Sequence, residues 1–234
     1  MDRITRKKLK QDEFAQDVGL TVEFLNEHRM QAIRYGVAGV AAIVLIVGLV
    51  VFFRHRGAER QAALTAALEV WQTPVGAPQE GMDRKPFATE DDKQKAAVKA
   101  FSDVAAKYSG SNEGAVAEYY LGSSAANGGK LDKAEVAFKE VIDSGNSNYA
   151  SLAKLTLASV YQTEHRQADG EKLLQSIIDS PTDFVSKEQA TIALARYVAP
   201  TDPERARKLL TPLRTARPSI SRLVAEELDS LPSK

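Results

Sequence analysis

Residues 113–145 read EGAVAEYYLGSSAANGGKLDKAEVAFKEVIDSG, and this stretch decides the fold. Its pattern predicts a helix, a tight glycine turn and a second, amphipathic helix. Leu121 and Gly122 let two antiparallel helices approach closely, because glycine adds no side-chain bulk. The small Ala134 then lies at the helix crossing, and Phe138 fills the gap one turn later. The stretch therefore predicts a packed pair of helices.

The same pattern recurs along the chain with a period of about 34 residues. Residues 149–181 read YASLAKLTLASVYQTEHRQADGEKLLQSIIDSP, and the matching positions are Leu157, Ala158, Tyr161, Gly170, Leu174, Ile177 and Pro181. A looser third unit follows, with an expected buried set of Leu194, Ala195, Ala206, Leu210 and Leu213. A helix over 220–231 is expected to cap the array, because a terminal repeat needs one polar outer face. The sequence thus predicts an all-α solenoid with repeats at about 113–146, 149–182 and 186–218.

Another repeat upstream is split by an insertion. Residues 96–111 read AAVKAFSDVAAKYSGS and place Ala97, Phe101 and Val104 where a second repeat helix needs them. Residues 73–92 hold three prolines and two glycines, which predicts a loop. We expect the helix over 57–72, with Leu64, Leu68 and Trp71 on one face, to supply the missing partner across that loop. The first repeat is therefore placed at 57–110.

Residues 35–53 read YGVAGVAAIVLIVGLVVFF and carry no charged side chain. As a helix the run spans about 28 Å, which matches the hydrocarbon core of a bilayer. A cleaved signal peptide is disfavoured, because the run begins after 34 residues and ends in FFRHR without a small-residue cleavage site. We therefore expect a transmembrane helix over 35–53 that contacts lipid. Ala38 and Ala42 form a small-xxx-small pair that would allow self-association.

Residues 1–34 form a tail with five basic residues among its first ten. Arginines flank the apolar run on both sides, so the basic tail decides the orientation, and we expect the N-terminus to lie inside the cell. The spacing of apolar residues from 12 to 34 predicts a helix that continues into the span or lies along the headgroups. The chain thus divides into a tail (1–34), a span (35–53) and a water-soluble domain (54–234).

Composition argues against most catalytic and nucleic-acid functions. The chain has 31 basic and 31 acidic residues, so it carries no net charge that would attract nucleic acid. It has no cysteine, and His28, His55 and His165 are too scattered to share a metal or activate a nucleophile. Gly128–Lys130 imitates part of a phosphate loop, but Leu131 replaces the required hydroxyl residue. We predict no catalytic, cofactor or metal site.

The repeat pattern resembles the tetratricopeptide repeat, in which Leu-Gly is followed by a small alanine and then an aromatic, as at Gly122, Ala134 and Phe138. The order of parts over the whole chain resembles the tetratricopeptide-repeat-like membrane family that includes the YfgM-type ancillary subunit of the SecYEG translocon. The resemblance implies a cytoplasmic tail, one span in the bacterial inner membrane and a periplasmic repeat domain. The absence of cysteine is compatible with that oxidising compartment.

The resemblance also implies that certain positions of each first helix line a concave groove. Those positions are Val116, Tyr119, Ser123 and Ala126, then Leu152, Leu155, Ser159 and Gln162, then Gln189, Ile192 and Arg196. The row is mixed and mildly apolar, which suits an extended or helical peptide. For Tyr119, Leu155 and Ile192, packing between repeats is an equally open interpretation.

These expectations favour a non-enzymatic scaffold that binds proteins at or near the Sec translocon, either its subunits or its translocating clients. One alternative is an envelope-assembly or cell-division coordinator with a different client. A membrane-tethered hydrolase is the alternative of another class. It would need a convergent cluster of histidine and carboxylate side chains, and the sequence supplies none.

Overall fold

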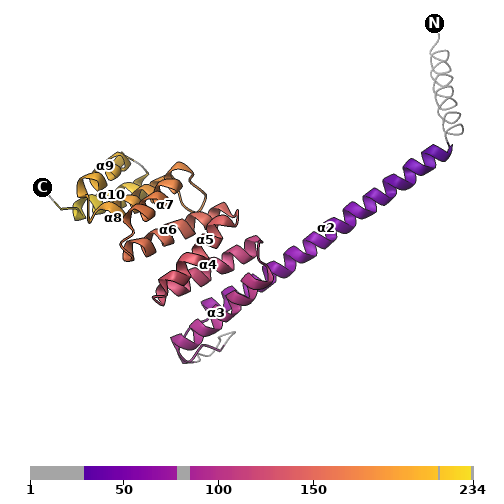
Figure 1. The fold of residues 1–234 in the computed structure, drawn as a ribbon, viewed down its shortest axis with the longest axis horizontal. Coiled ribbons are helices and arrows are strands. Elements are labelled where there is room, and N and C mark those ends of the chain that lie inside the picture. The colour runs from indigo at the N-terminus through magenta and orange to yellow at the C-terminus, as the bar shows by residue number, and fades with distance from the viewer. Residues whose placement is uncertain (1–28, 78–84, 216, 233–234) are drawn as a thin grey trace, which may run out of the picture. The chain divides into compact units, whose positions relative to one another are not determined.

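The computed structural model describes residues 29–77, 85–215 and 217–232, and its fold is the predicted all-α one (Figure 1). Within the described residues the only extended pairing is an isolated bridge between Val75 and Phe87. The chain separates into two compact units, Met1–Ala58 and Glu59–Lys234. Most of the tail, including the helix predicted from residue 12, lies outside the described residues.

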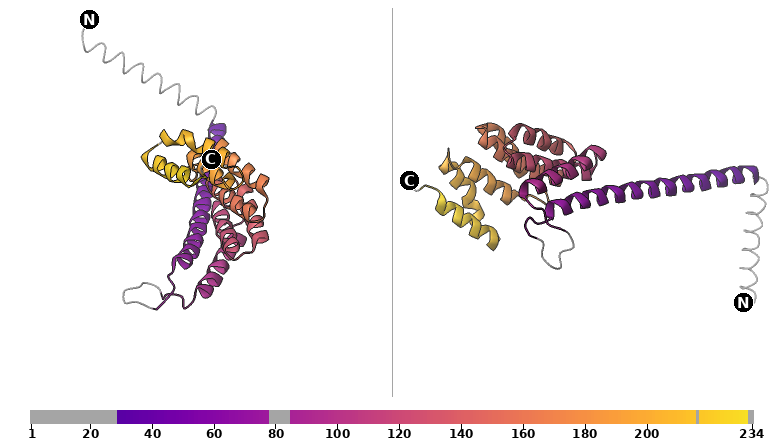
Figure 2. Two further views of the ribbon diagram at one scale, coloured as in Figure 1. Left: turned by 90° about the vertical axis from the view of Figure 1, so that its left-hand side faces the viewer. Right: turned by 90° about the horizontal axis from the view of Figure 1, so that it is seen from below.

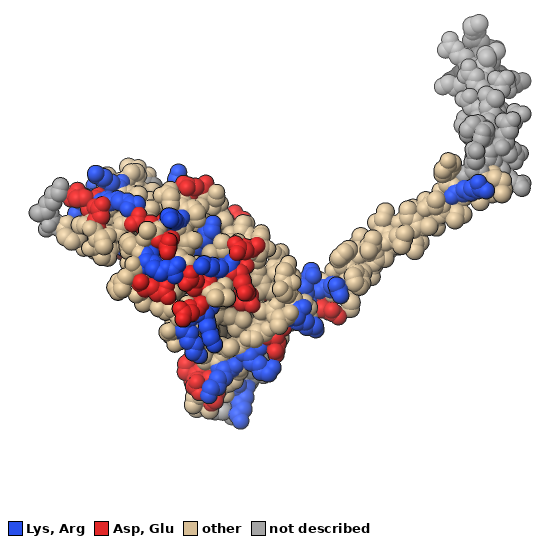
Figure 3. Space-filling model, viewed as in Figure 1, with Lys and Arg blue, Asp and Glu red and all other residues tan. Residues whose placement is uncertain are grey.

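The long apolar helix α2 (Arg29–Gln72) runs without interruption through 44 residues. It is long and apolar enough to cross a membrane. Between Tyr35 and Phe53 its large apolar side chains are at least half exposed, as at Leu45 (67%). In Figure 3 this stretch is tan, with blue Lys and Arg side chains at both of its ends. Such a surface is unfavourable in water, because monomeric soluble proteins rarely expose long apolar patches.

Consecutive antiparallel helices form the second unit (Figures 1 and 2). They are α3 (Glu90–Lys107), α4 (Asn112–Asn127), α5 (Leu131–Asp143), α6 (Ser147–Thr163), α7 (Gln167–Asp179), α8 (Lys187–Val198), α9 (Pro203–Leu210), the 3₁₀ helix η1 (Thr211–Thr215) and α10 (Pro218–Ser230). Each helix from α3 to α8 contacts the next one, and α4 also contacts α6, as α6 contacts α8. The C-terminal part of α2 packs on α3, with Leu64 and Ala67 in one cluster with Phe101.

Side-chain hydrogen bonds cap the N-termini of α4, α6 and α8, which are the first helices of their repeats. The Ser111 hydroxyl accepts a hydrogen bond from the Gly114 amide at 3.1 Å, and Asn146 accepts one from Tyr149. Ser186 and Gln189 form a reciprocal capping box at α8. The Thr89 hydroxyl accepts a hydrogen bond from the Asp92 amide and caps α3. That helix therefore begins at Glu90, within the stretch 73–92 that the sequence predicts to be a loop. A cap of this kind contributes about 1 kcal/mol to stability.

The turns between paired helices use left-handed backbone. Gly129 has φ +71° in the turn between α4 and α5, so Gly128–Lys130 is a repeat turn. The corresponding residue between α6 and α7 is His165, with φ +59°. Glycine adopts this conformation at little cost, whereas a side chain is strained there. The left-handed turn thus accounts for Gly129, and Gly128 is the C-cap residue of α4.

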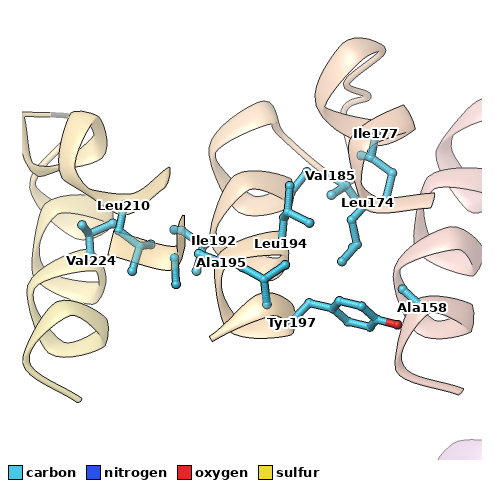
Figure 4. Packing of buried hydrophobic residues seen from close by; sticks show 13 residues of the cluster. Ala158, Leu174, Ile177, Val185, Ile192, Leu194, Ala195, Tyr197, Leu210 and Val224 are labelled. Carbon is cyan, nitrogen blue, oxygen red and sulfur yellow. The ribbon is translucent and has the colours of Figure 1, made fainter. Parts of the chain in front are cut away.

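Small residues allow the helices to pack closely. Ala134 and Phe138 are completely buried, and a Cβ atom at Gly122 would lie only 2.9 Å from the Phe138 ring. A Cβ atom at Gly170 would overlap the hydroxyl of the buried Tyr197. Figure 4 shows Tyr197 extending toward Ala158 from within the C-terminal core. These positions have no room for a larger side chain.

A polar network joins two repeats around Glu135. Its carboxylate accepts hydrogen bonds from Arg166 and from the Tyr161 hydroxyl, both at 2.8 Å, and pairs with Lys139 at 2.8 Å. The Arg166 guanidinium also lies 3.9 Å from the Tyr161 ring centroid. The hydrogen bond from Arg166 is the main reason that the pKa of Glu135 falls from 4.5 to about 2. The network therefore stabilises the ionised carboxylate of Glu135.

We predict that Glu135→Gln lowers the free energy of unfolding of the 59–234 fragment by about 1–2 kcal/mol at neutral pH. Because the folded pKa of Glu135 is depressed, its stabilising effect is complete above the ordinary value of 4.5 and is lost as the pH falls toward about 2. Urea unfolding of both proteins at neutral pH and at about pH 2.5 measures the difference. A difference that stays constant over this range would contradict the assignment.

Candidate protein-binding surface

The first helices α4, α6 and α8 lie in one row, because α4 contacts α6 and α6 contacts α8. All of the residues expected to line the groove lie on these three helices. Their exposure divides them into three groups. Only the exposed and half-buried groups are accessible to a partner.

Val116 and Ile192 are 6% and 3% exposed, which corrects the expectation that they line the groove. Val116 belongs to the cluster that contains Phe101, and Ile192 belongs to the C-terminal core with Leu194. Both side chains therefore stabilise the stack of helices and are covered by it. For Ile192, packing between repeats is the interpretation that the structure supports.

Tyr119, Ser123, Ala126, Leu152 and Leu155 are half-buried. Leu152 and Leu155 pack against the C-terminal core while part of each side chain stays accessible. The Ser123 hydroxyl donates to the Tyr119 carbonyl at 2.9 Å, one turn back in the same helix. These residues thus combine a structural role with an accessible edge.

Ser159, Gln162, Gln189 and Arg196 are exposed. Leu155, Ser159, Gln162 and Arg196 line one hollow of about 350 Å³ between α6 and α8, together with Ala158, Leu174, Ala193 and Tyr197. Arg196 donates its Nε–H to Glu227 of α10 at 2.8 Å, so the capping helix holds the arginine at the rim. Gln189 lies apart from the hollow and contributes to the α8 capping box.

A strip of aromatic side chains connects α2, α4, α6 and the segment before α8. We call Trp71, Tyr120, Tyr119, Tyr149 and Phe184 the aromatic strip. Successive ring centroids are 5.7, 5.8, 5.5 and 5.4 Å apart, all in edge-to-face geometry. The first four side chains are half-buried, and Phe184 is 46% exposed. The strip therefore joins three repeats and presents aromatic surface to a partner.

Burial raises the pKa of Tyr120 and of Tyr149, and the neighbouring tyrosines add to this effect. Both phenols are therefore neutral at physiological pH. They can donate hydrogen bonds to a bound peptide while their rings contact its side chains. The pair of tyrosines at 119–120 is the sequence signal that could have indicated the strip. The rings that they contact, however, come from segments distant in sequence.

A family model for the tetratricopeptide repeat-like domain matches residues 31–207, which is more than half of the chain. The chain belongs to this family. Neither the curated proteins nor the solved structures contain a match. Tetratricopeptide repeat-like domains are protein-interaction scaffolds, which assigns protein partners to this chain as well. The matched region contains the row of first helices and the aromatic strip.

The described residues of the tetratricopeptide repeat-like domain give no evidence of an enzyme. Among the described residues, no group of three or more histidine, cysteine or acidic side chains is placed to hold a metal ion. His165 lies in an exposed turn, and His55 lies on α2. His28 falls outside the described residues.

We predict that Ile192→Ala lowers the free energy of unfolding by about 2–5 kcal/mol, because it leaves a cavity in the C-terminal core. Gln162→Ala, on the same face but exposed, changes stability by less than about 0.5 kcal/mol. Chemical denaturation of the two variants tests which side chains are core and which are surface. Similar losses of stability for both variants would show that the two positions are wrongly assigned to core and surface.

Proposed function

We propose that this protein is a membrane-anchored scaffold whose repeat domain binds proteins at or near the Sec translocon. In this proposal residues 35–53 of α2 lie in the bacterial inner membrane, residues 1–34 in the cytoplasm and the repeat domain in the periplasm. The observation that carries it is the uncovered face of the first helices, with the aromatic strip and the hollow between α6 and α8. This face belongs to a chain that also has a long exposed apolar helix.

The anchor supports the proposal through effective concentration. A repeat domain tethered to a membrane meets other membrane-associated proteins at a much higher local concentration than a free domain does. Weak contacts along the aromatic strip and the hollow are then sufficient for capture. The tether is α2, in which the apolar stretch and the first helix of the split repeat belong to one continuous helix.

The chemistry of the face supports a peptide partner. The hollow combines aliphatic walls with the polar side chains of Ser159 and Gln162, and the aromatic strip adds large rings. Few polar groups on an apolar surface suit an extended or helical segment with apolar side chains. The association with the Sec translocon rests on the resemblance in the order of parts. An envelope-assembly or cell-division client would use the same surface.

The absence of cysteine allows a direct experiment, because Ser159→Cys introduces a unique thiol. Ser159 is exposed, so the substitution leaves the core unchanged. We expect a membrane-impermeant maleimide to label this thiol in intact spheroplasts. Labelling only after lysis would place the repeat domain in the cytoplasm and contradict the proposed orientation.

The same thiol, modified with a photoreactive benzophenone maleimide, tests the partner. We expect irradiation in native membranes to crosslink the protein to a subunit of the translocon or to a translocating chain. Lys172→Cys, exposed on α7, is the matched control and should give no such adduct. Adducts of equal yield at both positions would show that capture is unspecific. Adducts with an unrelated envelope protein would favour the alternative client.

A further inference from the structure

A second hollow, outside the row of first helices, lies between α3 and α5 above the C-terminal half of α4. Its volume is about 560 Å³, which falls within the range of sites that hold a ligand or a short segment of a partner. Val98, Leu121, Ala125 and Ala137 form its apolar floor, and Val98 is 37% exposed. We call this the lysine-rimmed cavity, for the side chains around it.

Four lysines surround the floor. Lys95 and Lys99 come from α3 and are engaged within their own helix, by Asp91 at 2.6 Å and by Asp103 at 2.7 Å. Among the residues that line the cavity, Asp91 is the only acidic one that the structure describes. The rim therefore carries a clear excess of positive charge.

Lys130 and Lys133 contribute the part of this charge that is not engaged in an ion pair. Both are exposed at the start of α5, and neither forms an ion pair within the described part of the chain. In the floor, Gln94 donates a hydrogen bond to Ser124 at 2.6 Å, so these two polar groups satisfy each other. A ligand that matches this cavity therefore carries negative charge for the rim and apolar side chains for the floor.

The neighbouring surface has the opposite charge. Lys133 also lines a neighbouring hollow of about 370 Å³, together with Glu118, Asp132 and Glu140. Burial is the main cause that raises the pKa of Glu118, and the nearby Glu140 carboxylate adds to the effect. An acidic ligand is thus repelled from one side of Lys133 and attracted to the other, which confines it to the lysine-rimmed cavity.

We propose that the lysine-rimmed cavity binds a segment of a protein partner in which acidic residues alternate with apolar ones. The acidic side chains pair with Lys130 and Lys133, and the apolar side chains contact Val98 and Leu121. This surface is separate from the aromatic strip and from the hollow between α6 and α8. It would give the scaffold a second binding site with a different specificity, and it does not depend on the identity of the client at the first.

The test measures binding of a short fluorescein-labelled peptide of alternating glutamate and leucine to the full-length protein in detergent micelles. We expect saturable binding that weakens as salt is added, because exposed charges are screened. Peptides with lysine in place of glutamate, or serine in place of leucine, should not show saturable binding. Equal binding of the serine peptide would overturn the role of the apolar floor.

The deciding variant is Lys130→Glu combined with Lys133→Glu, which should weaken binding by about tenfold or more. Acidic residues are favourable in the first turn of a helix, so the variant should keep its helical content by circular dichroism. Lys172→Glu, exposed on α7, is the matched control and should bind as the parent does. Unchanged binding by the double variant, or an equal loss with Lys172→Glu, would overturn the proposal.

Two further arms complete the test. Val98→Asp places a negative charge in the partly exposed floor and should also weaken binding. Short-chain phosphatidylglycerol, added as a competitor, should not displace the peptide. Displacement that is lost in the Lys130→Glu, Lys133→Glu variant would assign the cavity to a lipid headgroup and overturn the peptide proposal.

Discussion

The close approach of neighbouring helices at small residues is the constraint on which the rest of the repeat domain depends. Gly122 lies directly against the buried ring of Phe138, and Gly170 lies against Tyr197. Ala134 occupies a crossing with no accessible surface. Because protein interiors are packed at crystal-like density, these contacts fix the distance between helices. That distance brings α4, α6 and α8 into a single row.

The two proposed binding surfaces follow from this stacking. Rings that are far apart in sequence meet because the first helices are neighbours, as Tyr119 and Tyr149 do at 5.5 Å. The lysine-rimmed cavity forms because α3 and α5 flank α4, leaving Lys130 and Lys133 beside an apolar floor. Both surfaces combine partly exposed side chains with buried ones, such as Ala137, that also stabilise the stack. A repeat fold can therefore vary its partners without altering its core.

The fold could be predicted from sequence because its determinants are local. The Leu-Gly pair, the small crossing residue and the following aromatic lie within one helical hairpin, and the apolar run of α2 is contiguous. The depth of each surface residue could not be predicted in this way. Periodicity assigns Val116 and Ile192 to a face of a helix, but their burial depends on contacts from neighbouring repeats.

Interactions between repeats could not be predicted from the sequence for the same reason. Arg166 reaches Glu135 across 31 positions, and Tyr149 meets Phe184 across the following hairpin. No sequence spacing within one repeat predicts such pairs, because they depend on how the repeats stack. The lysine-rimmed cavity likewise combines side chains from α3, α4 and α5.

Thermal unfolding of Gly170→Ala in the 59–234 fragment tests the packing constraint most directly. The added methyl group overlaps the buried Tyr197, so we expect a loss of about 1–3 kcal/mol despite the better helix propensity of alanine. Gly128→Ala is the matched control, because its added Cβ would lie 3.4 Å from its nearest neighbour, an ordinary contact. We expect the free energy of unfolding of this control to lie within about 0.5 kcal/mol of that of the parent. Equal stability of the two variants would contradict it.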